Sequence, residues 1–424
     1  MMKRIKRKIK RIIFQTHKNK EKRKDGKIKA IGDIPIFSVG ELCSYLGIEI
    51  PNQYNGIRNR YVTETALFSR LENKKELISQ ITIRENFPKD FYNKFQKRSK
   101  SFKKIYYQIY DLKHTDQELL EMFVESQYVF WLKGFRGINY FSLELHRKSI
   151  AEAEKFINTS YSGHINKTCN RGIQRKYCTN KLLFNKKYTD YVKRDFLYPM
   201  ESTFEEFKAF CIKHPKLFAK PIEIGQGAGI RIIEVKNNIE EIFNECKDEK
   251  LIIEEIVVQH PEMAAFNSSG VNTLRICTLL KADGNPLVTN ATIRISRAGS
   301  IMSNGGLQAA IDIKTGKVTT NGFNKKREPF EVHPDSGKRF KDFQVPLWDE
   351  VIKATTESAK MLPNVRHIGW DIAITADDNV EFIEGNTDPS ATFANQTEDQ
   401  IGKKHIYEKH LPDIERYFQN HAPK

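Results

Sequence analysis

Cysteine is scarce in this chain, and long apolar runs are absent. The 6 cysteines among 424 residues form no C-x-x-C pair and no short cluster with histidine, which argues against a structural zinc site and a disulfide scaffold. No apolar run approaches the roughly 18 residues that a membrane-spanning helix needs. The N-terminus also lacks the uninterrupted apolar core of a signal peptide. We therefore expect a cytoplasmic protein with reduced thiols.

Two familiar catalytic and nucleotide-binding patterns are also missing. The sequence offers no Ser/His/Asp or Cys/His arrangement for nucleophilic catalysis. The glycine loop Gly225-Gln226-Gly227-Ala228-Gly229 lacks the Gly-Lys-Ser/Thr ending of a P-loop. A strand-like run follows it, whereas a dinucleotide-binding loop opens a helix. Such a loop, with Lys220 just before it, can close on phosphate oxygens through its backbone N–H groups, but glycine-rich hairpins without a ligand are common.

Positive charge is concentrated at the N-terminus. The net charge is +17, and residues 1–30 hold 14 lysine and arginine residues against Glu21 and Asp25. The isoleucines among these charges follow the spacing of one helix face. The tail therefore predicts a basic amphipathic helix that can bind an anionic surface, such as the inner face of the cell membrane. A solvated basic arm is the alternative, and a nucleic-acid contact is a weaker one.

The remainder of the chain changes character near residue 166. Residues 31–166 read as mostly helical, with apolar residues at 3–4 spacing in 102–112, 117–132 and 141–157. Residues 167–424 alternate short β-like runs with helices, which is typical of an α+β fold and not of a doubly wound parallel sheet. We expect a tail (1–30), a helical accessory domain (31–166) and an α+β domain (167–424).

Near the C-terminus, Ala376-Asp377-Asp378-Asn379 predicts the turn of a β-hairpin. If the turn is centred on the Asp377–Asp378 bond, Asp371 pairs with Glu384, and Asn386 shares their face. Two opposed carboxylates repel unless a cation lies between them, and oxygen ligands of this kind suit Mg²⁺ together with phosphate. Solvated polar groups on an exposed sheet face are the alternative.

A second hairpin is expected around the turn at Asp283-Gly284. If it is centred on the Gly284–Asn285 bond, Arg275 lies opposite Arg294. Like charges opposed in a sheet are destabilising, and an anion such as a triphosphate between them would relieve the repulsion. A one-residue change of register would place the two arginines on opposite faces. Upstream, the apolar run that ends in Glu254 and Glu255 can line an adenine slot or form an ordinary buried strand.

The glycine loop preceded by Lys220, the run that ends in Glu254 and Glu255, and the hairpin with Asp371 and Glu384 occur in an order that resembles the ATP-grasp superfamily. The likeness is closer to the sugar-transfer-associated ATP-grasp family, which is related to the α-L-glutamate ligases. The closer likeness rests on Asn272-Thr273-Leu274-Arg275, Asn304-Gly305-Gly306, Gly369-Trp370-Asp371 and Glu384-Gly385-Asn386. The resemblance implies an ATP-grasp fold for the α+β part of the chain, in which two α+β subdomains clamp ATP.

The resemblance also implies roles for individual residues. Asp371, Glu384 and Asn386 would hold one or two Mg²⁺, and Arg275 and Arg294 would stabilise the transferred phosphoryl group. The residues implied in nucleotide binding are Lys181, Lys220, Gly225, Gln226, Gly227, Ala228, Gly229, Glu254, Glu255, Val257 and Glu262.

The activity that the resemblance implies is ligation of a carboxylate to an amine. ATP would phosphorylate the carboxylate to an acyl phosphate, and the amine would then displace phosphate. The family's association with surface-polysaccharide synthesis suggests an amino acid or amine joined to a sugar carboxylate. Phosphorylation of an alcohol by the same site is one alternative. A non-catalytic protein that docks polysaccharide machinery on the membrane is another.

Overall fold

The computed structural model describes residues 135, 137–148, 150–223, 229–236, 238–300, 306–324, 327–387 and 396–422. The tail 1–30, the predicted helices at 102–112 and 117–132, and the loop residues Gly225, Gln226, Gly227 and Ala228 lie outside these ranges. The described helices include none that is long and apolar enough to cross a membrane.

The described residues form helices and strands in the mixed order expected for an α+β protein. The helices are α7 (Gly137–Ser142), η2 (Leu145–Arg147), α8 (Ile150–Ala153), α9 (Thr159–Cys169), η3 (Ile173–Arg175), α10 (Lys176–Thr179), α11 (Lys181–Lys187), η4 (Pro199–Glu201), α12 (Phe204–Lys213), α13 (Ile239–Asp248), α14 (Pro261–Ala264), α15 (Trp348–Lys360) and α17 (Lys404–Asn420). The strands are β1 (Phe196–Leu197), β2 (Lys216–Pro221), β3 (Arg231–Glu234), β4 (Leu251–Glu255), β5 (Thr273–Leu280), β6 (Pro286–Ile295), β7 (Leu307–Ala310), β8 (Gly322–Phe323), β9 (Pro329–Phe330), β10 (His367–Ile374) and β11 (Val380–Asn386).

The smaller sheet has the order β1-β4-β2-β3, and all neighbouring strands are antiparallel. Alternate residues of β2, Leu217 and Ala219, are buried and pack with Phe207 of α12 and Phe243 of α13. Alternate residues of a strand point to the same face, so α12 and α13 both pack on the face that carries Leu217 and Ala219. The strands β2 and β3 flank the glycine loop, so the expectation of a loop between two strands is confirmed.

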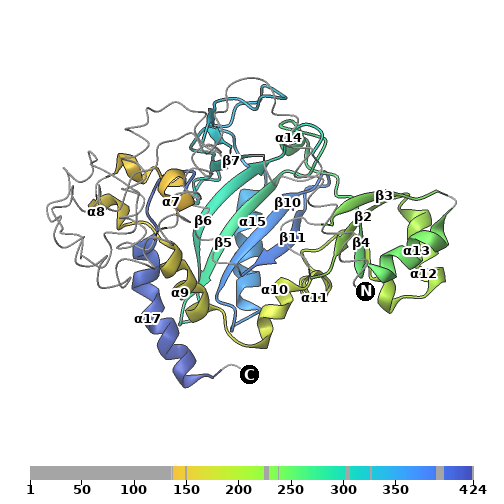
Figure 1. Ribbon diagram of the computed structural model, residues 1–424, viewed down its shortest axis with the longest axis horizontal. Helices are drawn as coiled ribbons and strands as arrows, with labels where there is room; N and C mark the ends of the chain where they lie inside the picture. The colour runs from red at the N-terminus through yellow and green to blue at the C-terminus, as the bar shows by residue number, and fades with distance from the viewer. Residues whose placement is uncertain are drawn as a thin grey trace, which may run out of the picture.

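The larger sheet has the order β11-β10-β5-β6-β7-β8-β9 and is antiparallel throughout (Figure 1). One face carries the large apolar side chains of β5, β6 and β10, such as Ile276, Ile293 and Trp370, and these form one core with Val351 and Ala354 of α15. Because successive side chains of a strand alternate between faces, the intervening residues point to the opposite face. That second face carries the polar residues discussed below.

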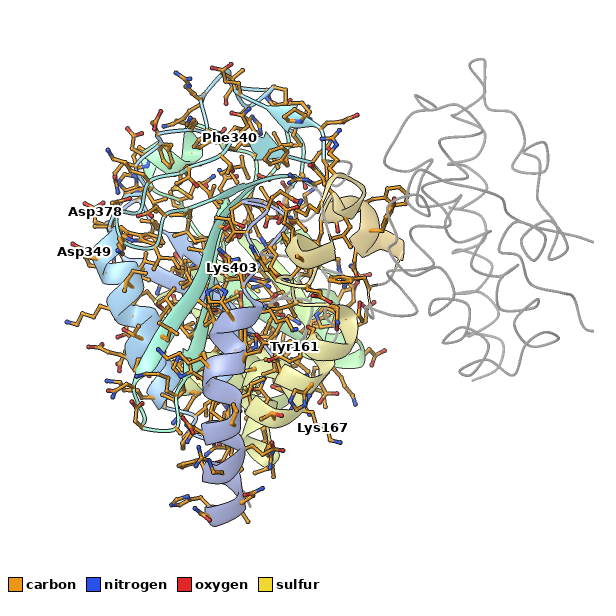
Figure 2. All side chains as sticks on the ribbon, turned by 90° about the vertical axis from the view of Figure 1, so that its left-hand side faces the viewer. Tyr161, Lys167, Phe340, Asp349, Asp378 and Lys403 are labelled. Atoms are coloured by element: carbon orange, nitrogen blue, oxygen red, sulfur yellow. The ribbon has the colours of Figure 1, made fainter. Side chains whose placement is uncertain are left out.

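At one end of the second face the sheet is covered by α9 and α17. Ile165 of α9 and Tyr407 of α17 pack on Leu279 of β5. Figure 2 shows the large sheet nearly edge on, with α15 on one side and the adjacent α9 and α17 on the other. The expected boundary at residue 166 falls inside α9. The predicted helical stretch 141–157 is divided among α7, η2 and α8.

Two glycines are required by the local geometry. Gly229, the last residue of the glycine loop, has a φ of +79°, and a Cβ at this position would lie 2.9 Å from Cγ of Pro221. Gly306 precedes β7, and a Cβ there would lie 1.8 Å from the backbone oxygen of Ile295. A side chain at Gly306 would therefore force β7 away from the end of β6.

Candidate active site

The candidate active site is a row of polar side chains across the large sheet. Asp371 of β10 pairs with Glu384 of β11 on one side and with Arg275 of β5 on the other. Arg275 in turn pairs with Thr292 of β6. Cross-strand partners point to the same face, so the four side chains form a continuous row opposite α15. All of them except the half-buried Glu384 are buried.

The predicted pairing of Asp371 with Glu384 is confirmed, although the ladder near the turn has a different centre. Thr375 N–H donates to the Asn379 carbonyl over 3.0 Å, and Ile374 pairs with Val380. The register shifts between Asp371 and Ile372, which pairs with Phe382. The extra residue in β11 is a β-bulge, and it restores the register that brings the two carboxyl groups together.

Asn386 completes the predicted group of three oxygen-bearing side chains. Its Nδ2 donates to Glu384 Oε1 over 3.1 Å and lies 3.4 Å from Asp371 Oδ2. Burial and the negative charge of Asp371 raise the pKa of Glu384. A divalent cation beside the two carboxyl groups would favour their ionised forms, so the donor set fits Mg²⁺. Rotation of the Asn386 amide would present its oxygen to the same ion.

The two predicted arginines reach the same carboxylate. Arg275 donates from Nε to Asp371 Oδ1 over 2.5 Å and from Nη2 to Oδ2 over 2.6 Å. Arg294 Nη1 lies 3.5 Å from Asp371 Oδ1. Burial alone would raise the pKa of Asp371, but the charges of Arg275 and Arg294 outweigh burial and hold that pKa below 3.8. A carboxylate oxygen has further lone pairs, so this pairing leaves room for a metal ligand.

The predicted direct opposition of the two arginines is wrong. Arg294 pairs with Thr273, and Arg275 pairs with Thr292. The error arises because the ladder is centred closer to Asp283, where Lys281 N–H donates to the Asn285 carbonyl over 3.0 Å and closes the turn. The shift equals two residues, so both arginines still share one face. The negative charge between them is supplied by Asp371 of the chain itself.

A buried network of charges joins the small sheet to the large one. Arg194 donates to Glu254 of β4, with Nε to Oε2 at 2.8 Å, and also pairs with Glu381 of β11. Lys220 of β2 pairs with the same Glu254, and Asn185 donates to its Oε1 over 2.9 Å. Burial alone would raise the pKa of Glu254, but Arg194 and Lys220 outweigh it and lower that pKa strongly. Glu254 is therefore held as a carboxylate.

The two lysines predicted to bind nucleotide are influenced by both Glu254 and Glu384. Lys181, the first residue of α11, donates from Nζ to the Pro221 carbonyl over 2.9 Å. Burial lowers the pKa of Lys181 and of Lys220, and the charge of Glu384 partly offsets the effect in both. Both ammonium groups are thus close enough to Glu384 to interact with it electrostatically.

Glu255, Val257 and Glu262 lie in described parts of the chain, and the two glutamates have partners outside this cluster. Glu255 accepts from the backbone N–H of Asp195 over 3.1 Å, whereas its neighbour Glu254 is engaged in the buried network. Val257 is half-buried in the segment after β4. Glu262 on α14 forms an exposed ion pair with Lys338 at 2.7 Å. The described part of the glycine loop is Gly229.

Several residues of the site were not found from the sequence. They are Asn185, Arg194, Thr292 and Glu381. None belongs to a motif, and their partners are distant in the sequence. A correct register for the hairpin of β5 and β6 would have identified Thr292, because it pairs with Arg275.

Residues 242–405 match the family model described as sugar-transfer associated ATP-grasp. This part of the chain belongs to that family. The matched segment contains Glu254, both arginines of the candidate site and the three candidate metal ligands, Asp371, Glu384 and Asn386. No curated protein was found to match the chain.

Among solved structures, the chain is similar to several ATP-grasp ligases. The ligase PsnB complexed with its precursor peptide PsnA2 and AMPPNP shares 16% identity at a TM-score of 0.31, over 52% of this chain and 53% of that one. The D-alanine-D-alanine ligase from Coxiella burnetii shares 11% identity at 0.35, over 58% and 60%. The D-alanine–D-alanine ligase from Bacillus anthracis shares 14% at 0.34, over 62% and 74%. The chain thus spans little more than half of the first two.

Proposed function

We propose that the protein is an ATP-dependent ligase that joins a carboxylate to an amine through an acyl phosphate, with Mg²⁺ as cofactor. The observation that carries this proposal is the row in which Glu384, Asp371 and Arg275 occupy paired positions on three adjacent strands. It combines oxygen ligands for a cation with guanidinium groups for an anion. Phosphoryl transfer from ATP needs both at one place.

The first step would transfer the γ-phosphoryl group of ATP to a substrate carboxylate. A carboxylate oxygen attacks phosphorus, the bond to the bridging oxygen breaks, and ADP leaves with the electron pair. Arg275 and Arg294 would neutralise the charge that develops on the phosphoryl oxygens. Asp371, Glu384 and Asn386 would hold Mg²⁺, which when bound screens the negative charge of the phosphates. The protein otherwise acts by holding the reactants in place.

The nucleotide would bind between the two sheets. We propose that Lys181, Lys220 and the loop from Gly225 to Gly229 contact the phosphates. Because the Glu254 carboxylate is already bound by Arg194 and Lys220, adenine would be held by backbone groups of Glu254 and Glu255 and by Val257. Glu262 would reach the ribose only after it leaves Lys338. Lys220 can turn from Glu254 to a phosphate only if Arg194 continues to neutralise the Glu254 carboxylate.

The substrates that we propose are an amino acid or other amine and a sugar carboxylate such as a uronic acid. The support for this class is the family's description as sugar-transfer associated. The class is tested with purified protein, Mg-ATP and a panel of uronic acids, with hydroxylamine added to trap any acyl phosphate as a hydroxamate. ADP and hydroxamate formed with a uronic acid would support the ligase. ADP with phosphate retained on an alcohol would instead establish a kinase.

The role of the row is tested by the variant Glu384→Ala. We expect it to abolish ADP formation and the rise in melting temperature that Mg-ATP causes in the wild type. The matched control is Glu357→Ala, which removes an exposed glutamate of α15 that hydrogen-bonds Tyr191. Unchanged ATP turnover in Glu384→Ala would exclude the proposed metal site.

A further inference from the structure

A buried carboxyl group beside the row has no role in the steps described above. Glu398 is only 5% exposed, and its Oε2 has no hydrogen-bond partner. Its other oxygen, Oε1, accepts a hydrogen bond from Thr397 Oγ1 over 2.8 Å. Burying a polar atom without a partner costs free energy, and few native groups remain in that state without a reason. Glu398 Oε2 therefore offers a vacant hydrogen-bond acceptor position.

Two polar side-chain atoms of β6 are likewise buried without a hydrogen-bond partner. Nε of Arg294 and Oγ1 of Thr292 are buried, and neither has a hydrogen-bond partner. The charges of Arg294 and Arg327 both act on Glu398, so both guanidinium groups lie within electrostatic reach of its carboxyl group. No hydrogen bond joins Glu398 to Arg294 within the described residues. A vacant donor on Arg294 thus stands near a vacant acceptor on Glu398.

The segment that carries Glu398 is fixed in position by its neighbours. Gln396 accepts from the backbone N–H of Ile157 over 2.8 Å and donates to the Ile157 carbonyl. Gln400 accepts from Lys148 Nζ over 2.8 Å and donates to the Ser142 carbonyl over 3.0 Å. Glu398 lies between these two anchored residues. The chain on both sides of Glu398 is therefore held in place.

We infer that the amine acceptor of the ligase binds between Arg294 and Glu398, and that Glu398 is the base that takes the proton from the attacking nitrogen. This inference rests on the proposed ligase function. An N–H donor would satisfy the Glu398 carboxyl oxygen, and an oxygen acceptor beside it would satisfy the Arg294 N–H group. The attacking amine supplies the donor, and the acyl carbonyl with which it reacts supplies the acceptor.

In the second step the nitrogen forms a bond to the carbonyl carbon. The bond from that carbon to the phosphate oxygen breaks, and phosphate leaves with the electron pair. The carbonyl oxygen, negatively charged as the bond forms, would accept from Arg294. The proton lost by nitrogen passes to the Glu398 carboxylate and then to solvent. Arg294 already approaches Asp371 at 3.5 Å, so the acceptor site adjoins the phosphoryl site.

The acidity of Glu398 suits this task. Burial raises its pKa to about 7, while Thr397, Arg294 and Arg327 act in the opposite direction. A base works best when its pKa is near the working pH. Arg327 also pairs with Glu144 over 3.5 Å and stacks on Phe323.

The test compares two nucleophiles in Glu398→Gln with the uronic acid that forms a hydroxamate in the wild type. The amines are a panel of free amino acids, and the reference nucleophile is hydroxylamine. Hydroxylamine is unprotonated at neutral pH and does not have to lose a proton before it attacks, and its product can release the proton to water. We expect amide formation to fall by roughly 10²–10⁴-fold, while hydroxamate formation stays near the wild-type rate. The rise of the amide-forming rate with pH through about 7 should disappear in the variant. Glu398→Asp should recover part of the rate.

The matched control is Glu144→Gln, which removes the same charge from a carboxylate that already pairs with Arg147 and Arg327. Equal amide and hydroxamate rates in wild type and Glu398→Gln would overturn the inference and leave the ligase intact. Loss of both products in a folded Glu398→Gln would also overturn it, because Glu398 would then serve the first step. Absence of hydroxamate from the wild type with every carboxylate would overturn the proposed function, and the acceptor site with it.

Discussion

Arg275 and Asp371 form a two-point ion pair from directly paired positions on β5 and β10, with hydrogen bonds of 2.5 and 2.6 Å. Both side chains are buried, Arg275 to 7% and Asp371 to 8% exposure. The pair is thus part of the core and also the centre of the candidate active site. Substitutions can separate its contribution to stability from its contribution to ADP formation.

Arg275→Met should unfold more easily than the wild type, by roughly 3–5 kcal/mol, because it leaves the Asp371 carboxylate buried without the cation that pairs with it at two points. The double variant Arg275→Met/Asp371→Asn should recover most of that stability, since no uncompensated charge remains. It should recover no ADP formation, because both functional groups are lost. Urea denaturation and the ADP assay measure the two effects. If the double variant lost as much stability as the two single variants together, the proposed stabilising interaction between Arg275 and Asp371 would be contradicted.

Arg194→Met should be destabilising by a similar amount, roughly 3–5 kcal/mol, because it leaves Glu254 with Lys220 alone and removes the cation that pairs with Glu381. It should also weaken ATP binding, since Lys220 would then be held by Glu254. The control is Lys186→Met, which breaks an exposed pair with Glu201 and should cost less than about 1 kcal/mol. Denaturation and calorimetry with ATP provide the measurements. Equal stability losses in both variants would be incompatible with the buried network.

Glu398 should make the protein less stable as the pH rises. Its pKa is raised from 4.5 to about 7 in the folded state, so the folded state holds the proton more tightly than the unfolded state does. The native state therefore loses stability between these two values, by about 3 kcal/mol in total. Glu398→Gln does not titrate. Its stability relative to the wild type should increase between pH 5 and pH 8, and a pH-independent difference in denaturation midpoint would refute the shift.

Removal of residues 1–30 should abolish sedimentation of the protein with vesicles that contain phosphatidylserine. Basic residues near such a surface contribute about 1 kcal/mol each, and the segment holds 14 of them. Replacement of Ile5, Ile9, Ile12 and Ile13 by serine keeps the charge and should weaken binding if the segment binds as an amphipathic helix. Vesicles of neutral lipid serve as the control. Binding that survives the deletion would place the membrane contact elsewhere.

The parts of the site that the sequence determined are those encoded by local patterns. The turn signal at Asp377–Asp378 and the alternation of the flanking runs predicted the hairpin and the face that Asn386 shares. The predicted pairing of Asp371 with Glu384 also depends on a β-bulge in β11, which the sequence did not reveal. A hairpin has a short loop, and a register error of one residue would have moved every apolar side chain to the wrong face. The same reasoning placed Arg275 and Arg294 on one face, although the turn at Asp283 shifted their pairing by two residues.

Only the tertiary structure decided which charges neutralise one another. Arg194 is 60 residues from Glu254 and 187 from Glu381, and Glu398 follows Arg294 by more than 100 positions. No periodicity links such residues, because their contacts arise where two sheets and a distant segment pack together. Burial then fixes their chemistry, since the removal of water raises the pKa of Glu398, whereas Arg194 and Lys220 hold Glu254 ionised. The sequence determined the strands and their faces, and the packing of those faces decided which ionisable groups meet.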